Sequence, residues 1–122
     1  MNFSVSKRFE SITHAFRGAV TLVATQHNAW VHLFATVAVV AVGFYFRVSS
    51  IEWIALIFAI ALVWIAEALN TGIEFLADEV SQERRERIKK AKDVAAFGVL
   101  AASAAAATIG FIIFIPYLGR FG

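Results

Sequence analysis

The chain has 122 residues, of which 60% are hydrophobic and 16% are charged, and it contains no cysteine. Soluble domains average about 25% charged and about 45–50% apolar residues, so this chain has too little polar surface to cover a water-soluble globule. The composition therefore predicts a membrane protein of one domain, residues 1–122, and it excludes intrinsic disorder, disulfide frameworks and thiol chemistry. The net charge of +2 does not indicate nucleic-acid binding, because most basic residues flank apolar segments, as is typical of membrane topology.

Residues 4–26 are predicted to form an amphipathic helix on the membrane surface. Apolar side chains recur there at steps of three and four, whereas the charged side chains take other faces. This pattern places the helix in the headgroup region with its basic flank toward anionic lipid. The segment is too polar to cross the membrane. The apolar positions are Phe9, Ile12, Phe16, Ala19, Val20 and Val23, and the charged ones are Lys7, Arg8, Glu10 and Arg17.

Three later segments are apolar over nearly the length that a transmembrane helix needs, about 20 residues. They cover residues 29–46, 51–69 and 95–118. Residues 47–50 alone separate the first two, so these two are expected to form a tight antiparallel hairpin. A polar stretch, residues 78–93, joins the second to the third and is predicted to be a loop. The fold class is therefore an all-α membrane protein with one surface helix and three transmembrane helices.

The distribution of basic residues predicts the orientation in the membrane. Residues 78–93 contain six basic side chains, and the amino-terminal segment contains Lys7, Arg8 and Arg17. The opposite ends of the spans carry only Arg47 and Arg120. Since Lys and Arg accumulate on the cytoplasmic side, the amino terminus and the loop are expected in the cytoplasm and the carboxyl terminus outside it.

Polar residues form a stripe along the second span and its continuation. Glu67, Asn70, Glu74 and Asp78 follow each other at steps of three, four and four, so they share one face of a continuous helix. Ionisable groups near lipid are costly and are functional by default, so the stripe is expected to face protein or water. Such oxygens suit a divalent metal or general-base work on a hydroxyl. The alternatives are that Glu67 is a structural acid bonded to a neighbouring helix and that the two residues near the loop are merely solvated.

Two further polar groups lie at the same predicted depth. Lys92 and Asp93 directly precede the third span, where a topology charge and a helix cap are the ordinary interpretation. Beside an acidic stripe, the same pair becomes a candidate nucleotide site, because a lysine can hold a phosphate. The entrance to the first span could line the same cleft, although single histidines at this depth are more often interfacial than ligating. Its polar residues are Gln26, His27, Asn28 and His32.

Two sequence segments carry a resemblance to a known family. Residues 66–78 read AEALNTGIEFLAD, and residues 91–102 read AKDVAAFGVLAA. The combination E-x-x-N-x-x-x-E-x-x-x-D followed by A-K-D resembles the prokaryotic diacylglycerol kinase family, small membrane lipid kinases that include undecaprenol kinases. The resemblance extends over nearly the whole chain, in length and in the order of its segments.

The resemblance implies that the chain transfers the γ-phosphoryl group of ATP to the hydroxyl of a membrane lipid, with Mg²⁺ as the metal. Glu67 would be the general base, Asn70 would help to order the reacting groups, and Glu74 would coordinate the metal bound to ATP. Asn28 and Trp30 would contact the lipid together with Glu67. The implied nucleotide-binding residues are Lys7, His14, Gln26, Glu74, Glu83, Arg84, Arg85, Lys92 and Asp93.

The chain departs from the family pattern at two of these positions. Gln26 stands where members often have a metal-binding Glu, so it keeps an oxygen donor but loses a charge. His14 replaces a Tyr seen in some members, so an imidazole stands where those members have a phenol ring. The resemblance further implies a homotrimer with sites shared between subunits, located in the bacterial cytoplasmic membrane.

The lipid is expected to be diacylglycerol, which would give phosphatidic acid, and undecaprenol is the alternative. Two hypotheses from other classes stay open at this level. In a non-enzymatic membrane scaffold, the acidic stripe would pack against a partner. In a proton- or ion-conducting oligomer, Glu67 would act as a relay, but the Lys92 and Asp93 pair would then have no purpose.

Overall fold

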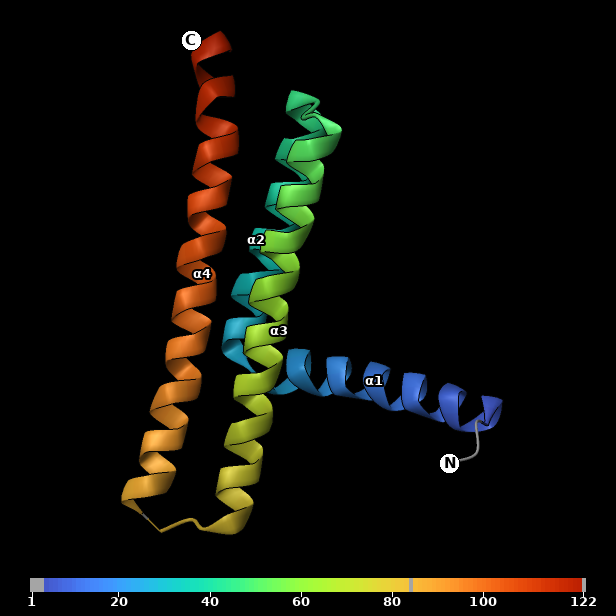
Figure 1. The fold of residues 1–122 in the computed structure, drawn as a ribbon, viewed down its shortest axis with the longest axis vertical. Helices are drawn as coiled ribbons and strands as arrows, with labels where there is room; N and C mark the ends of the chain where they lie inside the picture. Colours follow the sequence, from blue (N-terminus) through green and yellow to red (C-terminus); the bar gives the residue numbers. More distant parts are fainter. Residues whose placement is uncertain (1–3, 84, 122) are drawn as a thin grey trace.

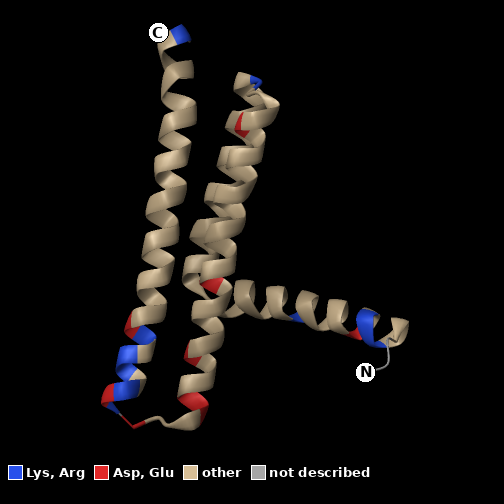
Figure 2. Ribbon diagram, in the orientation of Figure 1, with Lys and Arg blue, Asp and Glu red and all other residues tan. Residues whose placement is uncertain are grey.

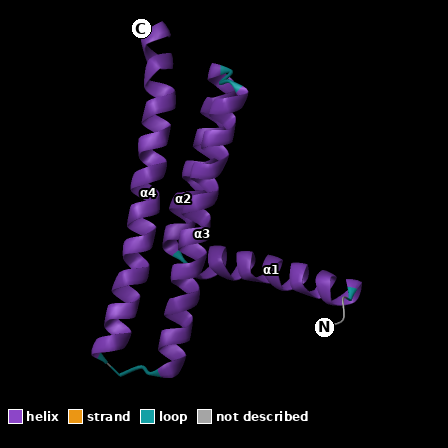
Figure 3. Cartoon of the chain, in the orientation of Figure 1, coloured by secondary structure: helices purple, strands orange, loops and turns teal. Residues whose placement is uncertain are grey.

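The protein is described here by a computed structural model that covers residues 4–83 and 85–121. Helices make up almost all of this part of the chain, and short connections separate them (Figure 3). The helices α2, α3 and α4 run side by side along the long axis, whereas α1 leaves them at a steep angle (Figure 1). The bounds are Val5–Thr25 for α1, His27–Phe46 for α2, Ser50–Val80 for α3 and Glu86–Phe121 for α4.

The change of direction between α1 and α2 is made by one residue, Gln26. Its backbone is extended, with φ −112° and ψ 121°, so it ends one helix and begins the next. At the other end of α1, the side chain of Ser4 accepts a hydrogen bond from the backbone N–H of Lys7, which caps the helix. The helix thus covers nearly the range predicted for the surface helix, and its location in the headgroup region stays a prediction.

The turn between α2 and α3 is the tight hairpin that the sequence predicts. Arg47 adopts a left-handed conformation with φ 53° and closes α2. Ser49 and Glu52 then form a capping box, in which the Ser49 N–H donates to Glu52 Oε1 at 2.9 Å and the Glu52 N–H donates to Ser49 Oγ at 3.2 Å. Both ends of the turn therefore satisfy backbone groups that would otherwise lack partners.

The connection between α3 and α4 differs from the sequence prediction. The predicted loop, residues 78–93, is mostly helical, because α3 continues to Val80 and α4 begins at Glu86. The stretch contains neither glycine nor proline, and Lys89 Nζ pairs with Asp93 Oδ2 one turn later at 2.8 Å. Charged residues with good helix propensity and such pairs let both helices extend beyond the apolar segments.

The buried core lies near the α2–α3 turn. Val48, Leu56 and Ile113 are buried there and are surrounded by partly buried aromatic side chains. The Tyr117 hydroxyl of α4 donates to Glu52 Oε1 of α3 at 2.5 Å, and its ring stacks on Phe46 of α2 at a centroid distance of 5.3 Å. These contacts fasten the end of α4 to the hairpin.

In the part of the chain that the structure describes, three helices are long and apolar enough to cross a membrane: α2, α3 and the part of α4 from Glu86 to Arg120. Large apolar side chains along them are exposed in the single chain, for example Phe34 at 77% and Phe58 at 71%. Such a surface suits hydrocarbon rather than water. Charged residues are concentrated at the joined ends of α3 and α4 and on the outer part of α1, and the middle of the long helices is nearly free of them (Figure 2).

Candidate active site

Glu67 is buried in the contact between α2 and α3. Its side chain is 1% exposed, and His32 Nε2 of α2 lies 3.3 Å from Glu67 Oε2. Within residues 4–83 and 85–121, His32 is the side chain that forms a hydrogen bond with the Glu67 carboxylate. A buried carboxylate needs such a partner because burial disfavours its charge. The contact is also one that a purely structural acid would make, so burial alone does not assign a function to Glu67.

Two polar side chains next to Glu67 are buried without a partner. Asn70 Oδ1 and Thr71 Oγ1 form no hydrogen bond among the described residues. Both residues are buried, with exposed fractions of 8% for Asn70 and 5% for Thr71. Leaving a buried polar atom unpaired costs free energy. An unpaired acceptor one helical turn from Glu67 is therefore a position at which a ligand or a second chain would supply the missing bond.

A chain of contacts holds the His32 side of this site. Trp64 Nε1 of α3 donates to Thr36 Oγ1 of α2 at 2.9 Å, and Thr36 Oγ1 donates to the backbone carbonyl of His32 at 2.7 Å. The His32 ring meets Trp64 edge-on, with the ring centroids 6.2 Å apart. The position of α2 relative to α3 is thus set directly beside Glu67.

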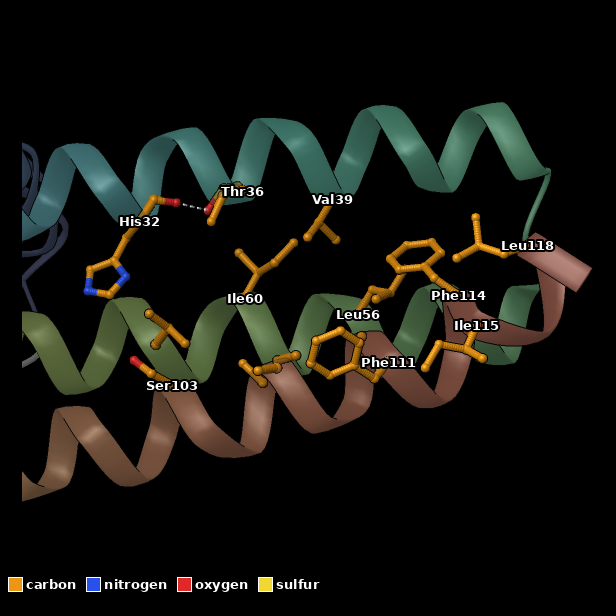
Figure 4. Close-up of a pocket in the computed structure, with 16 residues that line it drawn as sticks. His32, Thr36, Val39, Leu56, Ile60, Ser103, Phe111, Phe114, Ile115 and Leu118 are labelled. Carbon is orange, nitrogen blue, oxygen red and sulfur yellow. Dashed lines mark hydrogen bonds between the residues drawn. The ribbon is translucent and has the colours of Figure 1, made fainter.

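An apolar cavity of about 500 Å³ begins at His32 and continues between α2, α3 and α4. Figure 4 shows His32 and Ser103 at one end of the cavity and Phe114, Ile115 and Leu118 at the other. Most of its remaining wall consists of aliphatic side chains and alanine. Its size lies within the range of small-molecule sites, about 300–1,000 Å³. A hydrocarbon chain fits the chemistry of this lining.

A second, polar cavity of about 320 Å³ lies where α3, the loop and α4 meet. Lys92 Nζ of α4 donates to Asp78 Oδ1 of α3 across it at 2.6 Å. Of the residues that sequence analysis assigned to the nucleotide, Glu83, Arg85 and Lys92 line this cavity. Asp93 pairs instead with Lys89 on the surface of α4, and Arg84 lies outside the described residues.

Glu74 and Gln26 are the residues expected to hold the metal. Glu74 is half-buried on α3, and the Gln26 amide group at the α1–α2 bend donates to Thr25 Oγ1 at 3.2 Å. Among the described residues, no three side chains of the His, Cys, Asp or Glu type are grouped closely enough to hold a metal ion. A Mg²⁺ ion that arrives with a nucleotide needs only one or two protein carboxylates besides phosphate oxygens and water, and Glu74 fits that role.

The remaining predicted residues are spread over α1 and the start of α2. Lys7 and His14 are exposed on the part of α1 that extends away from the other helices. Asn28 is exposed, and Trp30 is 58% exposed. None of these four lines the polar cavity in this chain. One chain therefore gathers Glu83, Arg85 and Lys92 around the polar cavity, but it adds to them neither the predicted residues of α1 nor those at the start of α2.

Sequence reasoning did not assign a role to His32 as the partner of Glu67, nor to Asp78 as the partner of Lys92. His32 was visible as a polar side chain inside an apolar segment, at the depth of the acidic stripe. The sequence does not reveal the rotation of α2 about its axis, which decides whether the imidazole contacts α3. Asp78 was already part of the predicted polar stripe, but its pairing with Lys92 was not predicted.

Comparison with known proteins identifies the family. The family model described as prokaryotic diacylglycerol kinase matches residues 13–114. The chain is 34% identical over 114 residues to an undecaprenol kinase of Bacillus subtilis, and the match covers 93% of both chains. It is 37% identical over 109 residues to a diacylglycerol kinase of a Synechocystis strain, covering 88% of this chain and 62% of that relative. With this match over most of its length, the chain belongs to the prokaryotic diacylglycerol kinase family and is a lipid kinase.

Proposed function

We propose that the chain transfers the γ-phosphoryl group of ATP to a hydroxyl group of a membrane lipid, with Glu67 as the general base. The observation that carries the proposal is the position of Glu67. Its carboxylate is buried against His32, and His32 lines the end of the apolar cavity. A lipid whose chain occupies that cavity would present its polar end to Glu67.

The chemistry needs little more than position and charge. The lipid oxygen forms a bond to the γ-phosphorus while the bond from that phosphorus to the ADP oxygen breaks, and the hydroxyl proton passes to a carboxylate oxygen of Glu67. Proton removal by a positioned base contributes about 10²- to 10⁴-fold to such a rate. Asn70, whose Oδ1 has no partner among the described residues, would orient the reacting groups.

The polar cavity suits the nucleotide. Lys92 and Arg85 line it and would neutralise phosphate charge, which is the main requirement of phosphoryl transfer. Glu74 would bind Mg²⁺ with Gln26 as a neutral oxygen donor, and the metal would supply further charge neutralisation. Lys7 and His14 would reach the nucleotide from another copy, since α1 extends away from the cavity of its own chain. We therefore propose a homotrimer with shared sites, as the family resemblance implies.

Diacylglycerol is our first candidate for the lipid, and undecaprenol is the second. The relative matched over 93% of both chains is named an undecaprenol kinase, and the family model is named for diacylglycerol kinase, so both have equal support. Both lipids carry a primary hydroxyl, and the mostly aliphatic wall of the cavity suits an acyl chain and a prenyl chain alike.

The experiment is phosphate transfer from γ-labelled ATP with Mg²⁺ in mixed micelles that contain diacylglycerol in one arm and undecaprenol in the other. Label in one lipid identifies the substrate. Glu67→Gln removes the base but keeps the size of the side chain, so the rate should fall by about 10²- to 10⁴-fold. The matched control is Glu79→Gln, which removes an exposed carboxylate from the end of the same helix.

The proposal fails if neither lipid is labelled by folded protein, or if Glu67→Gln retains the rate of the parent. Circular dichroism and gel filtration in the same detergent establish that each variant is folded. Loss of the rate in Glu79→Gln to the same extent would show that any change of charge on α3 stops turnover, and it would remove the assignment of the base.

A further inference from the structure

We infer that His32 is a positioning residue that holds the Glu67 carboxylate in the orientation needed for proton removal. The inference rests on the proposed function, because it assigns His32 a task in that reaction. The geometry is specific: His32 Nε2 faces Glu67 Oε2 at 3.3 Å across the α2–α3 contact, and the side chains are 13% and 1% exposed.

A buried carboxylate that acts as a base must be held in place while one of its oxygens stays free of hydrogen bonds. Glu67 Oε2 is the oxygen that meets His32. No hydrogen bond in the part of the chain described here occupies Glu67 Oε1. If Nε2 of the imidazole donates to Oε2, the second oxygen stays free to accept the proton of the lipid hydroxyl. His32 thus fixes one oxygen and leaves the other for the reaction.

The surroundings of His32 fix the imidazole as well. Trp64 contacts the ring edge-on, and the Trp64–Thr36 hydrogen bond connects α3 to the helical turn on which His32 stands. Contacts from both α2 and α3 therefore hold the imidazole in place. An interfacial histidine would instead turn its ring toward water and leave Glu67 without a partner.

The His32 ring also lines the apolar cavity, so the same side chain adjoins the proposed lipid site. A residue at this point that only filled space would be replaceable by any side chain of similar volume. A residue that acts through Nε2 would be replaceable only by one that places a donor at the same reach. Glutamine meets that condition, because its amide nitrogen lies about as far from the backbone as Nε2, and asparagine does not.

The test compares His32→Leu, His32→Gln and His32→Asn in the labelled-ATP assay, with kcat and the KM for ATP measured separately. A hydrogen bond to a charged group is worth about 10- to 100-fold, so we expect His32→Leu and His32→Asn to lower kcat by that factor. The KM for ATP should stay unchanged, because the nucleotide cavity is elsewhere. His32→Gln should recover kcat to within about threefold of the parent, given that a neutral donor replaces a neutral donor.

Two further variants separate positioning from packing. Gly43→Ala disturbs the packing of α2 against Trp53 of α3 at the hairpin end, away from His32. It leaves the imidazole in place, so it should keep the parent kcat while lowering the thermal midpoint in micelles. In a Glu67→Gln background, His32→Leu should cause no additional loss, because the group that it positions is gone.

The inference is overturned if His32→Leu keeps the parent kcat, if His32→Gln and His32→Asn behave alike, or if Gly43→Ala loses as much activity as His32→Leu. Absence of lipid phosphorylation by the parent protein would instead overturn the proposed function, and with it this inference. The parent rate is measured first and tells these two failures apart.

Discussion

Lys92 and Asp78 join the loop ends of α3 and α4 through one ion pair, with Lys92 Nζ 2.6 Å from Asp78 Oδ1. The side chains are 38% and 59% exposed, and pairs this exposed contribute little to stability because water and salt screen them. The ion pair of Lys92 therefore adds little to the stability of the fold. Its position in the wall of the polar cavity agrees with the nucleotide site that we propose there.

We predict that Lys92→Met raises the KM for ATP by about 10- to 100-fold, the worth of a hydrogen bond to a charged group. The thermal midpoint in micelles should hardly change, since the exposed pair adds little stability. Lys90→Met is the matched control, because Lys90 is an exposed lysine of the same helix. Equal effects of the two substitutions on the KM would show that the general positive charge of the helix, rather than Lys92, attracts ATP.

The contact between α2 and α3 depends on a glycine at the hairpin end. Gly43 is buried in α2, and the ring of Trp53 from α3 lies against it. A β-carbon added at Gly43 would be 2.5 Å from Trp53 Cη2 and 3.0 Å from Cζ2. Trp53 also meets Phe44, with the ring centroids 4.9 Å apart, so the indole has little room to move. Close approach of the two helices therefore requires glycine here, as is common where backbones pack in membranes.

We predict that Gly43→Ala destabilises the protein by about 1–3 kcal/mol, the usual cost of overpacking. Thermal unfolding in micelles measures the change. The control Gly98→Ala adds a methyl group where no atom lies within 4 Å, and it should be neutral or stabilising by about 0.5–1 kcal/mol because alanine favours a helix over glycine. In Gly43→Ala, the added change Trp53→Phe should restore part of the stability, and no such recovery would mean that the indole is not the obstacle.

The whole molecule has two chemically different ends. The α2–α3 turn and the end of α4 meet at one end, where Tyr117 bonds Glu52, and the charged α3–α4 loop forms the other (Figure 2). The end with the loop holds the polar cavity. Basic residues accumulate on the cytoplasmic side of membrane proteins, so this end is expected in the cytoplasm, where ATP is found.

Because the chain contains no cysteine, single cysteines report this orientation without background. We expect Gln82→Cys, in the loop, to react with a membrane-impermeant maleimide only after the cell membrane is opened. Gly119→Cys, near the end of α4, should react in intact cells, because the two positions lie at opposite ends of the helices. Labelling of both positions in intact cells would contradict the arrangement.

The sequence predicted the helical class, the order of the segments and the polar stripe, because these follow from local chemistry. Apolar runs of membrane length form helices wherever backbone groups must bond internally, and the three- and four-residue steps of Glu67, Asn70, Glu74 and Asp78 place them on one face whatever surrounds them. The family also follows from these residues. The extent of α3 and α4 was underestimated, since hydropathy marks where lipid begins and not where a helix ends.

Only the tertiary structure decided which side chains meet across helices. The contact of His32 with Glu67 and that of Lys92 with Asp78 join residues 35 and 14 positions apart. Both contacts depend on how each helix is rotated and how far it is shifted along its neighbour. A single sequence carries no direct signal for these quantities, because in α2 nearly every face is apolar. Packing contacts such as that of Trp53 with Gly43 set the rotation and the shift of each helix. These contacts thereby decide which polar group lies beside the buried carboxylate.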